Sequence, residues 1–94
     1  MIIGGHHYKI KLVDEMKVEG GIVLGMHNTK ECVINIDKEQ TLSRKKETLI
    51  HETIHAILTN AGFAEQDEHY IDTLANGLFQ LGVGDLLWKK RGDK

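Results

Sequence analysis

Residues 41–62 read TLSRKKETLIHETIHAILTNAG, and this stretch decides the fold. Thr41 or Ser43 can cap a helix, because a hydroxyl oxygen accepts a hydrogen bond from a backbone N–H of the first turn. Gly62 suits the position just past a helix C-terminus, so we expect a helix that ends near Asn60. Its core face is predicted from helical spacing as Ile50, Ile54, Ile57 and Ala61, widened by Leu49, Ala56 and Leu58.

The same helix carries the pattern H-E-x-x-H as His51, Glu52 and His55. Residues four apart lie on one helix face, about 6 Å apart along the axis. Two imidazoles so placed can share one tetrahedral Zn²⁺ ion. Glu52 then lies beside the metal, where a carboxylate can hold a water molecule and take its proton. The alternative is an exposed polar stripe that binds no metal.

A second helix is predicted to begin near residues 65–67 and to fade at residues 82–84, and residues 85–88 add a last helical turn or a docked tail. Its core stripe is predicted as Ile71, Leu74, Leu78 and Leu81. A catalytic zinc site needs a third protein ligand, for which we choose Glu68. Asp72 is one turn further on and can accept a hydrogen bond from the free N–H of a ligating histidine. Asp72 and His69 are the alternative ligands, and a plain first-turn role for Glu68 remains open.

Three stretches before the helices indicate strands, namely residues 7–13, 22–27 and 31–36. In the first, Tyr8, Ile10 and Leu12 alternate with lysines, as in a half-buried strand. Short links between the three stretches favour an antiparallel meander. The sequence therefore predicts an α+β fold, with a three-stranded antiparallel sheet followed by two helices.

Bulk properties limit the classes of function. The 94 residues are enough for one domain, spanning residues 1–94. A formal charge of −2 gives no electrostatic footprint for nucleic acid or an anionic membrane. No signal peptide or membrane span is evident, so we expect a cytoplasmic protein. Cys32 is the single cysteine, which excludes an intrachain disulfide and suits a small buried hydrophobe.

H-E-x-x-H followed by a helix with Glu68-x-x-x-Asp72 resembles the gluzincin metallopeptidases. The runs at residues 46–50, 56–57 and 74–78 are similar to small metallopeptidase-like proteins of bacteriophages and prophages, related to the ImmA/IrrE group. This resemblance covers roughly residues 7–80. It implies a minimal zincin-like fold, zinc held by His51, His55 and Glu68, and Glu52 as general base. It also implies a bacterial or phage-infected host cell.

Two departures from related families matter. The metzincin pattern needs glycine at position 58 and histidine at position 61, whereas this chain has Leu58 and Ala61. Larger gluzincins carry a downstream domain that supplies a histidine or tyrosine to the oxyanion. Tyr70 is about 200° around the helix from Glu68 and does not suit that role. His27 is a candidate helper, with a surface turn histidine as the alternative, and a partner chain could also supply the group.

The leading hypothesis is a zinc-dependent peptidase in which Glu52 is the general base. Its substrate is expected to be a peptide or protein that lies extended along a sheet edge. The family resemblance suggests a particular regulatory protein, such as a repressor. The main alternative is a metal-binding regulatory or protein-interaction module with little or no activity. A third hypothesis, a metal-dependent hydrolase of a non-peptide bond, is disfavoured by the lack of a basic surface.

Overall fold

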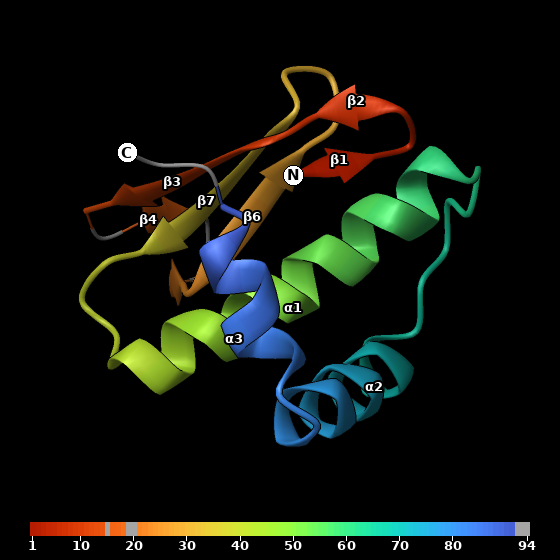
Figure 1. Cartoon of the computed structure of the whole chain (residues 1–94). Coiled ribbons are helices and arrows are strands. Elements are labelled where there is room, and N and C mark those ends of the chain that lie inside the picture. The colour runs from red at the N-terminus through yellow and green to blue at the C-terminus, as the bar shows by residue number, and fades with distance from the viewer. Residues whose placement is uncertain (15, 19–20, 92–94) are drawn as a thin grey trace.

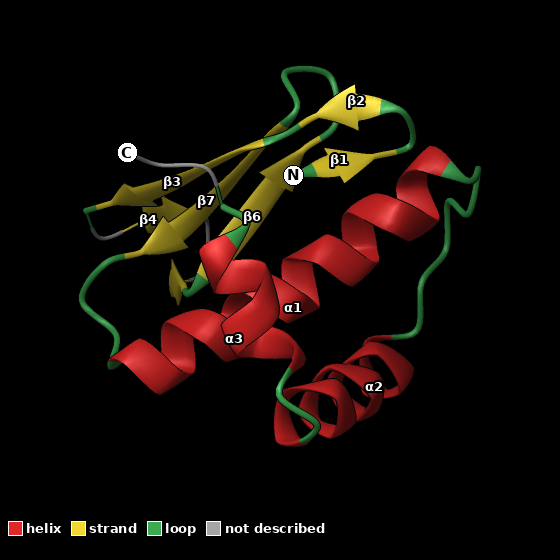
Figure 2. Ribbon diagram, in the orientation of Figure 1, coloured by secondary structure: helices red, strands yellow, loops and turns green. Residues whose placement is uncertain are grey.

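The computed structural model describes residues 1–14, 16–18 and 21–91, which form a small sheet stacked on a pair of helical layers (Figure 1). The elements are β1 (Ile2–Ile3), β2 (His6–His7), β3 (Lys9–Val13), β4 (Met16–Val18), β5 (Gly21–Val23), β6 (Gly25–Asn28), β7 (Val33–Asp37), α1 (Leu42–Asn60), α2 (Glu68–Gln80) and α3 (Val83–Lys89). Helix α1 crosses under the sheet, and α2 and α3 pack on α1 (Figure 2). Helix α1 is thus the middle layer of the fold.

The predicted α+β class is confirmed, but the predicted antiparallel meander is wrong. The central sheet has the order β3-β7-β6, in which β7 is parallel to β3 and antiparallel to β6. Strand β7 carries Ile34 and Ile36, both fully buried, so it takes the central position where both edges are paired. A separate β4-β5 hairpin lies between β3 and β6 in the sequence, and after it the chain enters the far edge of the sheet.

The strand boundaries also differ from the predicted ones. The stretch 22–27 is divided at Leu24 into β5 and β6. The stretch 7–13 contributes β3 and part of a β1-β2 hairpin, in which Ile3 pairs with His6. Tyr8 and Ile10 are buried as expected, whereas Leu12 is 40% exposed. Cys32 precedes β7, is partly buried and packs against the core.

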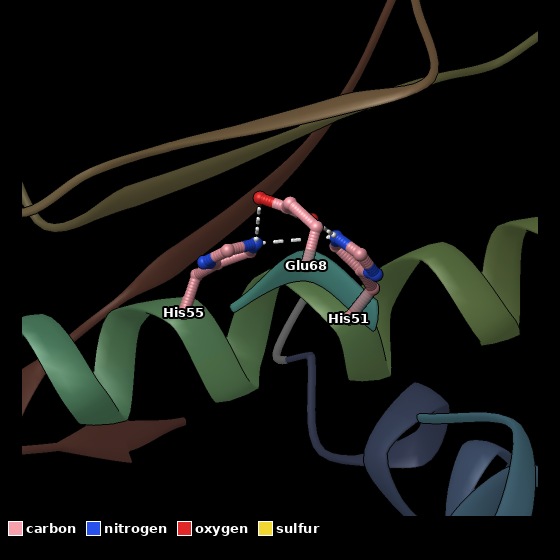
Figure 3. Close-up of side chains that lie close together, drawn as sticks. All are labelled: His51, His55 and Glu68. Atoms are coloured by element: carbon pink, nitrogen blue, oxygen red, sulfur yellow. Dashed lines mark hydrogen bonds and ion pairs between the residues drawn. The ribbon is translucent and has the colours of Figure 1, made fainter. Parts of the chain in front are cut away.

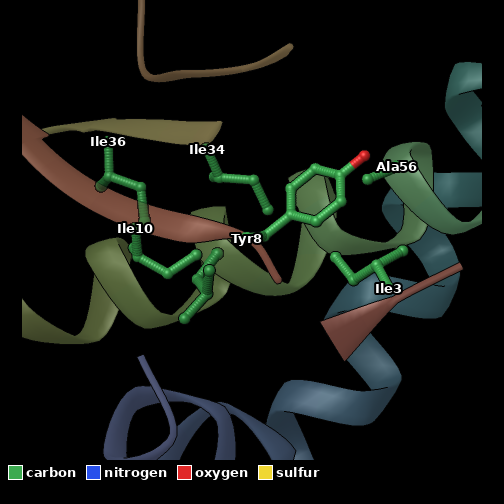
Figure 4. Packing of buried hydrophobic residues seen from close by; sticks show 7 residues of the cluster. Ile3, Tyr8, Ile10, Ile34, Ile36 and Ala56 are labelled. Carbon is green, nitrogen blue, oxygen red and sulfur yellow. The ribbon is translucent and has the colours of Figure 1, made fainter. Parts of the chain in front are cut away.

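The hydrophobic core lies between the sheet and α1 (Figure 4). It consists of Ile3, Tyr8, Ile10, Ile34, Ile36, Leu49 and Ala56. The buried face of α1 therefore follows Leu49, Thr53 and Ala56, at spacings of four and three residues. Leu49, Ile50 and Ala56 are buried as predicted, whereas the predictions for Ile57, which is 50% exposed, and for the exposed Ala61 are wrong. This rotation of the helix also buries the polar side chains of Glu52 and His55.

Helix ends follow the predicted signals more closely than helix faces. The Thr41 side chain accepts a hydrogen bond from the Arg44 N–H at 3.3 Å, and Gly62 has a φ of +96°. Helix α2 starts at Glu68 because the Asp67 carboxylate caps it. Its predicted core stripe is only partly correct, since Ile71 is buried but Leu74 and Leu81 are 49% and 80% exposed.

None of the helices in the described part of the chain combines the length and the apolar character needed to cross a membrane. The predicted tail segment is helix α3, which packs on both α1 and α2. Lys46 on α1 and Asp85 on α3 form an ion pair of 2.6 Å. Leu87 and Trp88 lie against the hydrophobic core. Helix α3 therefore helps to hold the middle layer in place beneath the sheet.

Candidate metal centre

His51 and His55 from α1 meet Glu68 from the first turn of α2 (Figure 3). The two Nε2 atoms of the histidines are 3.2 Å apart. Glu68 places Oε1 at 3.3 Å from the Nε2 of His51 and Oε2 at 3.0 Å from the Nε2 of His55. In the described residues these three side chains form one group whose ligand atoms all lie within 4.8 Å of one another.

These distances suit a tetrahedral zinc ion. Ligand atoms about 2.0–2.1 Å from such an ion lie about 3.3–3.4 Å from one another. The observed separations of 3.0, 3.2 and 3.3 Å are close to that value. Two imidazole nitrogens and a carboxylate are also a common set of protein ligands for catalytic zinc. The three residues therefore fit the ion by both geometry and chemistry.

The other nitrogen of His55 is held by Gln66. The Gln66 Nε2 lies 2.8 Å from the backbone oxygen of Phe63, and that oxygen can only accept a hydrogen bond. This contact fixes the amide orientation, so its Oε1 is the atom that faces His55 Nδ1 at 2.6 Å. His55 Nδ1 must then carry the proton, and the lone pair of His55 Nε2 faces Glu68 and His51.

His51 is held in the same way by Asp72. The Asp72 Oδ1 lies 2.9 Å from His51 Nδ1, so the contact expected between this carboxylate and one of the histidines is present. A proton on each Nδ1 atom leaves the two Nε2 atoms available to a cation shared with the Glu68 carboxylate. The outer oxygens raise the basicity of each histidine.

Glu52 lies on the β6 side of α1 and is only 9% exposed. Its Oε1 accepts a hydrogen bond from His27 Nδ1 at 3.0 Å. Glu52, His51, His55 and Glu68 all line one recess of about 270 Å³ under β6. The sequence expectation that Glu52 accompanies the two histidines is consistent with this shared recess.

His27 is not a surface turn histidine, contrary to that alternative. It lies within β6, its side chain is 25% exposed, and its ring stacks on the His55 ring at 5.6 Å between centroids. The reason is strand alternation, since Gly25 and His27 share the half-buried face of β6 that meets α1. Sequence reasoning missed the contact with Glu52 because it joins two elements 25 residues apart. It also missed Gln66, which no motif marks.

A larger cleft of about 700 Å³ adjoins the recess, between β6 and helices α1 and α2. Its lining is apolar near the sheet and polar along the helices. The residues are Val23, Leu24, Gly25, Arg44, Glu47, Thr48, His51, Glu52, His69, Asp72, Thr73, Ala75 and Asn76. His51 and Glu52 line both the cleft and the recess. A peptide that lay in the cleft would therefore reach the candidate metal centre.

The remaining candidates lie elsewhere. His69 lines the cleft but is not in the ligand group, and Asp72 faces the far side of the His51 ring. Tyr70 is 70% exposed on α2, consistent with the expectation that it is no oxyanion donor. His6 and His7 are exposed on β2. The geometry therefore favours Glu68 over the two alternative ligands.

Comparisons with known proteins identify no family for this chain. A scan of protein-family models, a search of curated proteins and a search of solved structures each returned no match for this chain. The resemblance to gluzincins therefore stays a prediction that depends on the H-E-x-x-H pattern and on Glu68 and Asp72.

Proposed function

We propose that this chain is a zinc-dependent peptidase whose metal ligands are His51, His55 and Glu68. One observation carries the proposal: both Nε2 atoms face Glu68 while both Nδ1 atoms are held by oxygen acceptors. Bound zinc would supply Lewis acidity, lowering the pKa of a water molecule toward about 7 and polarising a carbonyl group. Asp72 and Gln66 would keep the two ligating rings in place.

Glu52 is the general base of this proposal. It takes a proton from water as the water oxygen forms a bond to the peptide carbonyl carbon. It then passes that proton to the amide nitrogen as the carbon–nitrogen bond breaks, which releases an amine and a carboxylate. Its burial beside the two histidines supports the assignment, because a purely structural metal site needs no carboxylate base there.

The substrate would be a peptide or protein segment in extended form. Within the described part of the chain, β6 pairs with a strand on one side only and borders the cleft. An extended peptide can add to such an edge through backbone hydrogen bonds. Strand β6 spans only Gly25–Asn28, so few such bonds can form. Further contacts, specific to one partner, would have to hold the substrate, and this suits the cleavage of a particular protein. A regulatory protein such as a repressor is suggested by the family resemblance alone.

The alternative is a metal-binding regulatory or protein-interaction module with little activity. Helix α2 buries just Ile71 and Ala75, so a metal between α1 and α2 would add much to the stability of this small chain. That gain requires His51, His55 and Glu68 but not Glu52. The role of Glu52 therefore separates the two functions.

The test compares zinc-loaded wild type with Glu52→Gln. Both are incubated with casein and with a mixed peptide library, and mass spectrometry identifies the products. We expect equal zinc content at one ion per chain, and a loss of cleavage by about 10²- to 10⁴-fold in the variant. A zinc-loaded wild type that cleaves no substrate would support the module. Equal cleavage by the two proteins would remove Glu52 from its role as base.

A further inference from the structure

His27 contacts the two functional parts of the site at once. Its Nδ1 lies 3.0 Å from Oε1 of Glu52, and its ring lies nearly parallel to the His55 ring, at an angle of 10°. We propose that His27 is a positioning residue, which fixes the Glu52 carboxylate for proton transfer. This inference rests on the proposed peptidase function.

Glycine at position 25 brings His27 within reach of Glu52. A Cβ atom on Gly25 would lie 2.6 Å from Cγ2 of Thr48 and 3.1 Å from Cγ of Glu52. Contacts this short exclude a side chain there unless β6 moves away from α1. The backbone of β6 therefore lies directly on α1, and His27, two residues further along the same face, covers the next turn of the helix.

The Glu52 carboxylate needs such a partner. It is nearly buried, and among the described residues His27 is the one group that hydrogen-bonds to it. A carboxylate on a flexible side chain can rotate, and it is then no longer aligned with the proton that it must remove as a base. A hydrogen bond to Oε1 holds the group in one orientation and leaves Oε2 for water.

Stacking on His55 fixes the plane of the His27 ring. The ring centroids are 5.6 Å apart, within the range of an offset stack. The His27 Nδ1–H can then donate to Glu52 without competing for the Nε2 atoms of His51 and His55. The structure thus assigns His27 to the base rather than to the metal, and zinc affinity should not depend on it.

Three variants test this assignment, namely His27→Ala, His27→Asn and the control His7→Ala. His7 is exposed on β2 and lines neither the recess nor the cleft. On a peptide that wild type cleaves, we expect His27→Ala to lower kcat by about 10- to 100-fold with an unchanged KM, the range seen for outer residues of metal sites. His27→Asn should recover part of kcat, because its amide N–H can donate to Glu52. His7→Ala should match wild type.

NMR and zinc-affinity measurements provide a second test that does not require catalytic activity. In the zinc-loaded wild type, ¹⁵N-edited NMR should show a protected Nδ1–H of His27, and Glu52→Ala should remove that protection. Zinc affinity, measured by chelator competition, should be equal in all His27 variants. A loss of zinc affinity in His27→Ala, or an equal fall of kcat in His7→Ala, would overturn the positioning role. Active wild type with fully active His27→Ala overturns this inference alone, whereas inactive wild type overturns the proposed function and this inference together.

Discussion

The candidate metal centre combines two pairs of residues, each four apart on a helix, in very different surroundings. The side chains of His51 and His55 on α1 are 23% and 11% exposed. Those of Glu68 and Asp72 on α2 are 66% and 64% exposed. Helix α1 lies between the sheet and the other helices, whereas α2 contacts its neighbours on one side only. The histidines are thus placed by the core, and the carboxylates by the docking of one helix.

This difference indicates how the site divides its tasks. The buried half holds the imidazole rings and the Glu52 carboxylate, whose places depend on the packing of α1. The exposed half completes the candidate ligand set and depends on the docking of α2.

His55→Ala should abolish zinc binding, because it removes a ligand from the core-held half. Glu68→Ala should weaken zinc binding by more than about 100-fold, which exceeds the effect expected of residues that only support a ligand. Some binding should remain, because His51 and His55 are still in place. Chelator competition measures both affinities, with the exposed His69→Ala as the matched control. Normal zinc binding by Glu68→Ala, together with loss in Asp72→Ala, would show that Asp72 is the third ligand.

Asp72→Ala should have a smaller effect, a decrease in zinc affinity of about 10- to 100-fold. The His51 ring would lose the acceptor 2.9 Å from its Nδ1 but keep its position on α1. Asp72→Asn should lose less, because an amide oxygen can still accept that hydrogen bond. Chelator competition again gives the affinities. If Asp72→Ala matched wild type, the orientation of His51 would depend on α1 alone.

The sequence predicted local features of this molecule better than distant ones. Thr41 and Gly62 mark the ends of α1 because capping depends on neighbouring residues. The contact of Asp72 with His51 followed from helical spacing and from the short link between the helices. The sheet order and the partner of Glu52 did not follow, because both depend on β7 entering the sheet between β3 and β6.

The helix faces were predicted less well for a related reason. Apolar spacing placed Ile57 on one broad core face with Leu49 and Ala56, but the sheet packs on Leu49 and Ala56 and leaves Ile57 half exposed. A helix can turn only one face toward a sheet. The face of α1 that buries Glu52 and His55 leaves Ile57 on the exposed side. Gln66 escaped notice because a link residue carries no periodic pattern, although its amide holds His55.

The smallest predicted effect concerns α3, which an ion pair between Lys46 and Asp85 joins to α1. Lys46 beside Asp85 holds the pKa of that carboxyl below its ordinary value. The pair therefore stabilises the fold above the ordinary pKa of an aspartate, and this contribution is lost as the pH falls through the lowered pKa. Asp85→Asn should cause a small, salt-sensitive decrease in Tm at pH 7 that vanishes in acid.

Thermal unfolding of the zinc-free protein at pH 7 and at acid pH measures this effect without interference from the metal. The zinc affinity of Asp85→Asn, measured separately at pH 7, should equal that of wild type, because α3 contributes no ligand. A weaker affinity would mean that α3 also positions α2, which it contacts. The two halves of the site would then depend on one another through α3.

The central place of β7 has a consequence for how the chain folds. Lys9 pairs with Val33 and His27 pairs with Ile34, so β3 and β6 both have β7 as their partner. Neither strand has its sheet partner until residues 33–37 are available, and the parallel pair must close a long loop. Residues 1–32 alone therefore contain no paired strand of the central sheet. The placement of His27 against α1 thus depends on β7 as well as on β6, because β6 has no other partner in the described sheet.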